Sequence, residues 1–208
     1  MDFCDWRRMR LTLVSRMRAH PPPQDAHWPD DAIFTLGHST LSIDRFVALL
    51  KIYGIERLID IRTVPASRHN PQFKGSALAD SLKAEHLDYL HITALGGLRH
   101  PRKDSPNGGW RNESFRGYAD YMQTAAFRDA LEALIGMSRE RRVAIMCAEA
   151  VPWRCHRSLV ADALEVRGIA AIEILSETSY RTHKLTPFAR VDGTSITYPL
   201  EQATLPGV

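Results

Sequence analysis

The stretch Val143-Ala-Ile-Met-Cys-Ala-Glu-Ala-Val-Pro-Trp-Arg-Cys-His-Arg157 joins a short apolar run to a turn that carries several reactive side chains. Its first four residues have the composition of a buried parallel strand. Residues 158–167 follow the turn with helical spacing, which ends at Gly168. A strand, a turn and a helix in this order predict one unit of an α/β protein with a parallel sheet.

The same alternation extends through most of the chain. Further apolar runs predict strands at residues 32–36, 57–62, 87–92 and 170–175. Helical spacing occurs between them at residues 42–54, 78–82, 115–122 and 127–137. Strands that alternate with helices form a parallel sheet that is covered on both faces. We therefore predict an α/β three-layer sandwich with a mainly parallel sheet of about five strands and helices on both faces.

Length and composition suggest how the chain is divided. Its 208 residues are many for one small domain and few for two, and 44% of them are hydrophobic, which is enough to fill a core. Arginines dominate the first residues, and Pro21-Pro-Pro23 then interrupts any helix. We predict a basic, Pro-rich N-terminal extension at residues 1–31, a single α/β domain at 32–199 and a C-terminal tail at 200–208.

Charge and cysteine usage bound the environment. The formal net charge of +3 is slight and does not by itself indicate a nucleic-acid partner. Three cysteines provide no even disulfide framework, and two of them lie close to His156, which suits a reducing compartment. The chain has no apolar run that could span a bilayer, and the segment after Met1 lacks the core of a signal peptide. We expect a cytoplasmic protein with no membrane partner, while no pattern specifies the oligomeric state.

Polar residues gather at the predicted ends of the strands. In parallel sheets, ligands bind outside the carboxyl ends of the strands, near the point where the strand order reverses. The residues that follow these ends, or lie in the adjacent turns, are His38, Ser39, Asp60, Arg62, Gly96, Gly97, Arg99, Cys147, Glu149, Cys155 and His156. Core packing does not explain this distribution, so we predict that these residues surround one site.

Cys155 is the predicted nucleophile of this site. It neighbours His156 at the start of a helix, where the helix dipole and nearby arginines stabilise a thiolate. We expect a pKa below the ordinary value of about 8.5, although burial acts in the opposite direction. Cys147 is interpreted as a small buried hydrophobic residue, and Asp60 with Arg62 equally suits a structural ion pair. The predicted catalytic residues are Cys155, His156, His38, Asp60 and Glu149.

Two basic loops flank the predicted site. The loop from Leu95 to Asn112 has the length of a binding loop, and its Trp110 is available for stacking on a base. The loop after the second strand contributes Ser67 and Arg68, and arginine suits contacts with phosphate. Solvated surface loops would explain the same residues. The predicted substrate-binding residues are Ser39, Arg62, Ser67, Arg68, Gly96, Gly97, Arg99, Trp110 and Arg157.

Several motifs in a fixed order make the chain recognisable. They are Gly37-His-Ser39, Asp60-x-Arg62-x-x-Pro65-x-Ser67-Arg68, Leu95-Gly-Gly97, Phe115-Arg-Gly-Tyr118, and Cys147-Ala-Glu149 with Cys155-His-Arg157. Together they resemble DUF488, a family named as a domain of unknown function, over about residues 33 to 199. The resemblance implies an α/β sandwich with a mainly parallel sheet. It brings no activity, substrate or catalytic assignment.

The residues themselves favour some reactions over others. The Cys-x5-Arg loop of phosphatases is not present, because Cys147 and Arg154 lie one residue too far apart and no glycine separates them. A tetrahedral zinc site is conceivable from Cys147, Cys155 and His156, with His38 or Glu149 as the fourth ligand. The spacing of these residues is not that of a familiar zinc knuckle.

We predict an enzyme that acts on a phosphate-bearing substrate, such as a nucleotide, a modified nucleoside or a nucleic acid, through the Cys/His site. One alternative is a non-catalytic module that binds a nucleotide or nucleic acid through its arginines and Trp110. Another is a metal-dependent hydrolase or deaminase that uses the cysteines and His156. An anionic small molecule or a nucleic acid is the expected partner, and the sequence specifies no cofactor.

Overall fold

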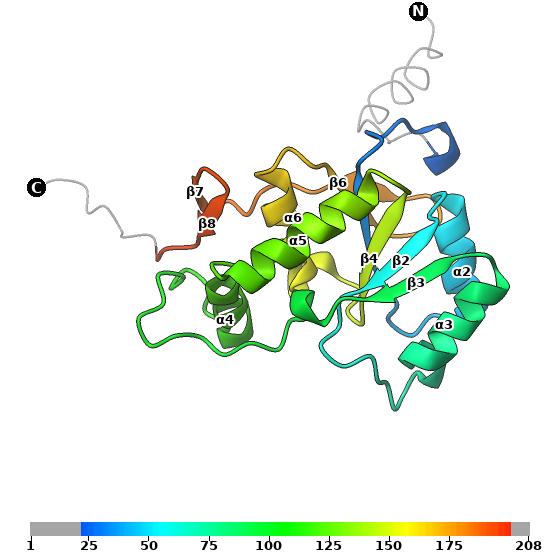
Figure 1. Cartoon of the computed structure of the whole chain (residues 1–208), viewed down its shortest axis with the longest axis horizontal. Coiled ribbons are helices and arrows are strands. Elements are labelled where there is room, and N and C mark those ends of the chain that lie inside the picture. Colours follow the sequence, from blue (N-terminus) through cyan, green and yellow to red (C-terminus); the bar gives the residue numbers. More distant parts are fainter. Residues whose placement is uncertain (1–21, 201–208) are drawn as a thin grey trace, which may run out of the picture.

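The structure, a computed structural model, describes residues 22–200 and contains a six-stranded sheet in the order β3-β2-β4-β1-β5-β6 (Figure 1). Strands β1 to β5 are parallel, and β6 is antiparallel to β5. The bounds are β1 Ile33–Gly37, β2 Arg57–Asp60, β3 Asp88–His91, β4 Val143–Cys147, β5 Ala171–Ile174 and β6 Tyr180–Thr182. The predicted mainly parallel sheet is confirmed. Residues 1–21 of the predicted extension and 201–208 of the predicted tail lie outside the described residues.

Alternating side chains divide the core into two layers. Along β4, Val143 and Ile145 pack into one buried cluster, and Ala144 and Met146 pack into another. This alternation follows from the geometry of a strand, in which successive side chains point to opposite faces. All five residues of β4 are buried, as expected for the central strand of a sheet that is covered on both sides.

Helices α2 (Ile43–Ile52) and α3 (Gly75–Ala84) cover one face of the sheet. Ser42 caps α2, because its hydroxyl accepts a hydrogen bond from the Arg45 amide. Gly54 follows the helix with a φ of 64°, a left-handed conformation that glycine adopts without strain. The sequence signals for the start and end of this helix are therefore confirmed.

Helices α4 (Glu113–Tyr121), α5 (Ala125–Ser138) and α6 (Arg157–Glu165) cover the other face. Asn112 caps α4 and Thr124 caps α5 through their side-chain oxygens. In Figure 1, these helices lie on the opposite side of the strands from α2 and α3. The three-layer sandwich predicted from the sequence is confirmed.

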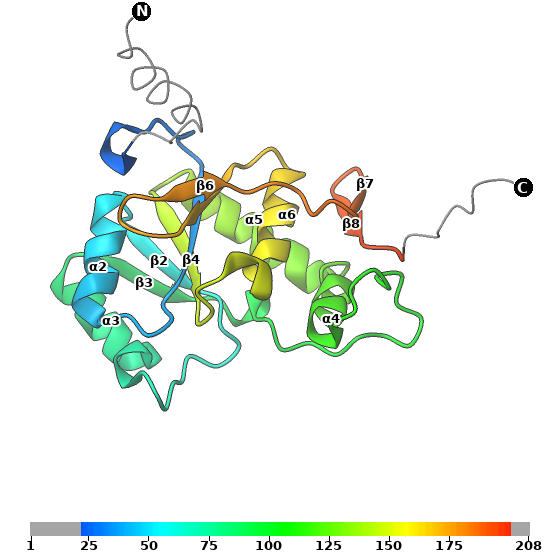
Figure 2. The same cartoon turned by 180° about the vertical axis from the view of Figure 1, so that it is seen from behind.

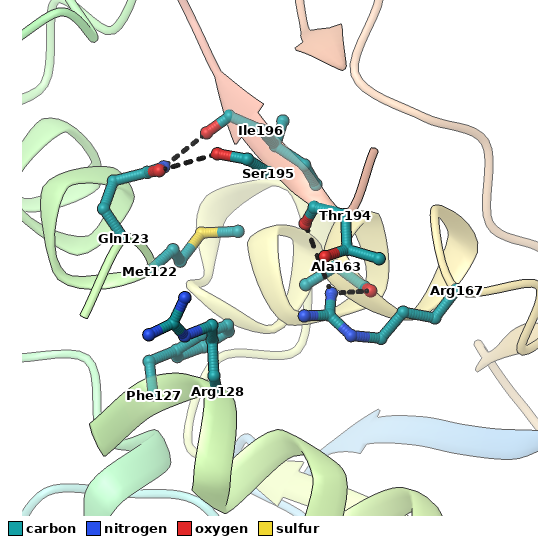
Figure 3. Close-up of a pocket in the computed structure, with 9 residues that line it drawn as sticks. All are labelled: Met122, Gln123, Phe127, Arg128, Ala163, Arg167, Thr194, Ser195 and Ile196. Atoms are coloured by element: carbon teal, nitrogen blue, oxygen red, sulfur yellow. Dashed lines mark hydrogen bonds between the residues drawn. The ribbon is translucent and has the colours of Figure 1, made fainter. Parts of the chain in front are cut away.

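The chain after β5 was not predicted in detail. It forms β6 and then runs past α6 to a hairpin of β7 (Arg190–Asp192) and β8 (Ser195–Thr197), as Figure 2 shows from behind. The hairpin is fixed to the end of α4, where Gln123 contacts Ile196 and Ser195, and to α6 through Arg167 and the Thr194 carbonyl (Figure 3). A cavity of about 70 Å³ remains between these elements. It has room for only a few water molecules.

A buried charged cluster anchors this C-terminal segment to the sandwich. The ring of His183 lies between two carboxylates, with Nε2 at 2.8 Å from Asp162 and Nδ1 at 2.9 Å from Glu173. Asp162, on α6, also accepts hydrogen bonds from the amide and hydroxyl of Thr186 and from the hydroxyl of Tyr198. Burial would lower the pKa of His183, but the two carboxylates raise it to about 9. The segment is therefore fixed by a protonated imidazole between two anions.

The connections create a crevice at the end of β4. The helix that follows β1 lies on one face of the sheet, and α6, which follows the adjacent strand β4, lies on the other. The connections that follow β1 and β4 thus diverge to opposite faces at the carboxyl ends of these neighbouring strands. Ligands bind at such points in open parallel sheets. None of the described helices is both long and apolar enough to cross a membrane.

Candidate functional site

A cavity of about 480 Å³ opens at this crevice. Its walls come from the ends of β2 and β4, from the loop after the short helix η3 (Thr93–Leu95), from the start of α4 and from the short helix η4 (Pro152–Arg154). Six residues expected at the site line it, namely Arg62, Gly97, Cys147, Glu149, Cys155 and His156. The volume is that of a typical small-molecule site.

Cys147 and Arg157 form the most unusual contact of the cavity. The Arg157 side chain is 1% exposed, and its Nε donates to the Cys147 sulfur at 3.0 Å. Its remaining donors contact the Thr35 hydroxyl and the carbonyls of Glu149 and Ala150. No carboxylate of the described residues takes part, and a buried cation without an anion beside it is costly. Both cysteines interact with the guanidinium, and Cys147, whose sulfur accepts from Nε, is the better placed to supply a negative charge.

A hydrogen bond joins the two cysteines, and the structure reverses the roles expected for them. Burial favours a neutral Cys147 thiol, but the hydrogen bond from Cys155 and the charge of Arg157 lower the pKa of Cys147 to about 7. The same hydrogen bond, together with burial, raises the pKa of Cys155 well above its ordinary value. The prediction of a lowered pKa at Cys155 is therefore wrong. The guanidinium donates to the Cys147 sulfur, so negative charge is favoured there rather than at Cys155.

His156 is a neutral acceptor rather than a cation. Its Nε2 lies 3.1 Å from the Ile61 carbonyl, which accepts hydrogen bonds only, so the proton of the ring is placed on Nε2. The lone pair of Nδ1 therefore faces the Cys155 sulfur at 3.6 Å. Burial lowers the pKa of His156 to about 4, against the effect of the Ile61 carbonyl. The ring consequently stays uncharged at neutral pH and orients the Cys155 thiol.

Asp60 and Arg62 form a buried ion pair at the end of β2. The Nε of Arg62 lies 2.9 Å from one carboxylate oxygen and its Nη2 lies 2.5 Å from the other, which also accepts from the Tyr89 hydroxyl. His38 lies behind this pair, with Nε2 at 3.5 Å from the guanidinium and its ring stacked on Phe73. Arg62 borders the cavity, whereas Asp60 and His38 are not among the residues that line it. The structural ion pair considered from the sequence is confirmed.

Two glycines permit the close approaches on which the site depends. A Cβ at Gly37 would lie 1.7 Å from the Glu149 carbonyl oxygen, so the loop after β4 rests directly on the end of β1. A Cβ at Gly97 would lie 2.4 Å from Nδ1 of His156. Contacts this short exclude any side chain at either position. Gly37 thereby places the Cys147 loop, and Gly97 places the imidazole.

Comparison with known proteins identifies the family. A family model described as "Domain of unknown function DUF488" matches residues 42–164, which is more than half of the chain. This chain belongs to the DUF488 family. The match begins at the N-cap of α2 and extends into α6, so both cavity cysteines lie inside it, whereas His38 lies before it. No curated protein and no solved structure matches the chain.

Several residues that the sequence assigned to the DUF488 site lie away from the cavity. Arg99 packs its guanidinium 3.7 Å from the centre of the Tyr121 ring and donates to the Gly96 carbonyl. Ser67 accepts a hydrogen bond from a neighbouring backbone amide, and Arg68 is exposed. Among the predicted substrate-binding residues, those that do not line this cavity include Ser39, Ser67, Arg68, Gly96 and Arg99. Arg157 contacts Cys147 from within the core, so its predicted contact with substrate is replaced by one with the thiol.

Trp110 belongs to the core rather than to the DUF488 crevice. Its ring packs against Phe115, Phe188 and Tyr198, with centroids 4.8 to 5.5 Å apart. The loop that carries it is fixed by Asp120, which accepts hydrogen bonds from Arg102, Ser105 and Asn107. The segment is therefore an anchored connection, and Trp110 lines a different cavity, which it shares with Trp153, rather than the cysteine cavity.

The described residues offer no metal site. They contain no group of three or more His, Cys, Asp or Glu side chains that could hold a metal ion. Cys147, Cys155 and His156 lie together, but neither His38 nor Glu149 completes a ligand set with them. Moreover, Nε2 of His156 is occupied by the Ile61 carbonyl. The predicted tetrahedral zinc site therefore finds no support in this part of the chain.

Other cavity residues were missed by reading the sequence. Polar groups come from Thr63, Asn112 and Ser114, and the apolar part of the wall includes Val64, Leu98 and Phe115. Arg154 lies on the rim, is exposed, and forms no ion pair with a described residue. The sequence placed Cys147 at the site, because it is the last residue of an apolar strand and such strand ends face the crevice. Its role was missed, since it was interpreted as a small buried hydrophobic residue.

Proposed function

We propose that this DUF488 protein is an enzyme that uses the Cys147 thiolate as a nucleophile on a phosphate-bearing substrate. The observation that carries the proposal is the contact of the buried Arg157 guanidinium with the Cys147 sulfur at 3.0 Å. A thiolate is a far better nucleophile than a thiol, and a neighbouring cation is a common way to generate it. A structural cysteine requires no such partner.

The electrostatics of the rim favour an anionic substrate. Arg154 is exposed at the cavity and unpaired among the described residues, so its charge is available to a ligand. The nine-residue helix α6 begins beside Cys155, and its N-terminus favours negative charge. Arg62 supplies a second guanidinium at the wall, although Asp60 already neutralises it. The cavity of about 480 Å³ accommodates a nucleotide or a modified nucleoside.

The arrangement of the two sulfurs suggests a sequence of steps. The Cys147 thiolate attacks an electrophilic centre of the substrate, a bond to sulfur forms, and the leaving group departs with the bonding electron pair. Cys155 then gives its proton to the leaving group. Water next attacks the sulfur-bound group and gives its proton back to Cys155, which restores the starting thiolate. His156 takes no proton in this scheme, since its low pKa suits a group that only orients Cys155.

Alkylation with iodoacetamide tests the nucleophile. In a Cys4→Ser background, mass spectrometry of peptides should place the rapid modification on Cys147, with a rate that rises through a midpoint near pH 7. Cys147→Ser should abolish this rapid modification. Pyrophosphate should slow the modification of Cys147 in the parent protein, and it should slow it much less in Arg154→Ala. Rapid modification of Cys155 alone would overturn the assignment of the nucleophile.

Turnover separates the enzyme from a non-catalytic module. Phosphorus NMR spectra of a mixture of nucleotides should change with time in the presence of the parent protein and stay constant with Cys147→Ser. Should pyrophosphate protect Cys147 while no spectrum changes for nucleotides or for a short RNA, the binding module would be the better account. The alkylation experiment would still stand in that case, because it reports the thiolate and not the reaction.

A further inference from the structure

A second and larger cavity lies on the other side of η4. It has a volume of about 650 Å³ and is formed by η4, the start of α6, β6 and the segment after β6. The residues that define its chemistry are Trp153, Glu173, Arg181, His183 and Lys184. None of these residues lines the cysteine cavity. The two cavities are nevertheless neighbours, because Trp153 faces the second one and the next residue, Arg154, faces the first.

Trp153 offers an aromatic surface to this second cavity. Its side chain is 58% exposed, which is unusual for the largest apolar side chain. The guanidinium of Arg181 lies 4.9 Å from the centre of the indole ring. Arg181 also pairs with Glu173, which holds the guanidinium in place. The guanidinium lies over one face of the indole, so a planar ring would stack on the opposite face.

Lys184 gives the cavity its net positive charge. Arg181 and His183 also line the wall, but Glu173 and the buried Asp162 balance their charges. The Glu173 charge is already shared between Arg181 and His183. Lys184 is exposed at the cavity and forms no ion pair with a described residue. Its ammonium group is therefore available to an anion.

The wall is rigid because it is part of the buried cluster described above. His183 is fixed between Asp162 and Glu173, and Thr186 donates two hydrogen bonds to the same Asp162 carboxylate. Residues 183–187 thus have little freedom to collapse into the cavity. A preformed, positively charged pocket with an exposed indole is matched to a ligand that combines an aromatic ring with an anionic group.

We propose that the cavity between η4 and β6 binds a nucleoside phosphate, with the base stacked on Trp153 and the phosphate paired with Lys184. The ligand is either a free nucleotide or a nucleotide unit within a single strand, since both present the same chemistry. The proposal does not depend on the Cys147 thiolate, because it rests on a separate set of residues.

Isothermal titration calorimetry with AMP, adenosine and oligoadenylate tests the proposal. AMP should bind the parent protein, and Trp153→Ala should weaken it by roughly 5- to 150-fold, the range seen when a stacking aromatic is removed. Lys184→Gln should weaken the binding of AMP but leave the binding of adenosine unchanged. Oligoadenylate that binds much more tightly than AMP identifies a strand as the source, and equal affinity identifies the free nucleotide.

Matched variants keep the test independent of folding and of the cysteine site. Lys83→Gln removes the same charge from an exposed position of α3 and should leave AMP affinity unchanged. Trp153→Phe retains an aromatic ring and should lose only a fewfold, and thermal melting confirms that each variant is folded. Absence of AMP and oligoadenylate binding, or equal binding by Trp153→Ala and the parent, would overturn the second site. Iodoacetamide modification of Cys147 in Trp153→Ala reports the first site separately, and it should proceed at the parent rate in either case.

Discussion

Two buried charged clusters lie along α6, and they differ in how their charge is balanced. Around Asp162, every charge has a charged partner, since a protonated His183 lies between two carboxylates and further donors saturate Asp162. Around Arg157, a fully buried cation has no carboxylate partner among the described residues, only a thiol, a hydroxyl and carbonyls. The first cluster is complete in itself, whereas the second is balanced only when Cys147 is ionised.

This difference separates a structural role from a chemical one. A fully satisfied polar network rigidifies the fold, and removing one member leaves the others buried and unpaired. A cation balanced by a thiolate instead holds a reactive group in its charged form. Mutations in the Asp162 cluster should therefore act mainly on stability, and those in the Arg157 cluster mainly on reactivity.

The largest effect is expected from Asp162→Ala. It removes the acceptor of four hydrogen bonds and leaves His183 with one carboxylate, so the free energy of unfolding should fall by about 3–5 kcal/mol. Urea denaturation measures this loss. Asp162→Asn keeps an acceptor of the same shape and should lose less. A loss below about 1 kcal/mol for Asp162→Ala would show that the cluster is not a structural anchor.

The next largest effect is the pH dependence of the unfolding free energy that His183 confers. Its pKa is raised from 6.5 to about 9, so its stabilisation is full below pH 6.5 and is lost as the pH rises through 9. This loss corresponds to roughly 3 kcal/mol. The lowered pKa of Cys147 makes the free energy of unfolding rise with pH above pH 7, which opposes the effect of His183. The pH dependence of the unfolding free energy is therefore best measured in a Cys147→Ser background. There, His183→Gln should flatten the decline in unfolding free energy, and an unchanged slope would contradict the protonated imidazole.

A smaller effect, on reactivity, is expected from Arg157→Met. Without the guanidinium, the pKa of Cys147 should rise, although the hydrogen bond from Cys155 still lowers it. Iodoacetamide should then modify Cys147 at pH 7 at least about 5-fold more slowly, since only about one thiol in ten is ionised one pH unit below its pKa. Arg157→Lys keeps a cation and serves as the control. Unchanged reactivity in Arg157→Met would remove the basis for assigning the thiolate to Cys147.

The smallest effect is expected from Cys155→Ser. A serine hydroxyl can still donate a hydrogen bond to the Cys147 thiolate, so the alkylation rate of Cys147 should stay within about threefold of the parent rate. Cys155→Ala removes the donor, and the rate at neutral pH should then fall further because the pKa of Cys147 rises. Were Cys155→Ser to abolish the rapid phase, Cys155 would be the reactive residue after all.

The fold was largely predictable because its signals are local. Each of the five parallel strands begins and ends within two residues of the predicted range, since a central strand such as Val143–Cys147 must be apolar on both faces. The short strands after β5 were not predicted. Tyr180–Thr182 and Arg190–Asp192 are three residues long and mostly exposed, so they leave no apolar run in the sequence.

The candidate site was predictable in place but not in detail. The strand-end rule correctly brought Cys147, Cys155 and His156 to one cavity. Which cysteine ionises depends on the direction of the Arg157 side chain, and a helical position alone does not fix that direction. Trp110 was misplaced for a similar reason, because only the tertiary structure shows that Phe188 and Tyr198 surround it.

The close packing at Gly37 bears on how this protein can be altered. A methyl group there would overlap a carbonyl oxygen of the Cys147 loop, so the neighbouring strand dictates the position of the sulfur. A library of variants that seeks new substrates should therefore hold positions 37 and 97 constant. It can vary the exposed residues Val64 and Leu98, whose side chains border the cavity and make none of its hydrogen bonds. Diversity placed at the rim would reshape the entrance while the sulfur keeps its place.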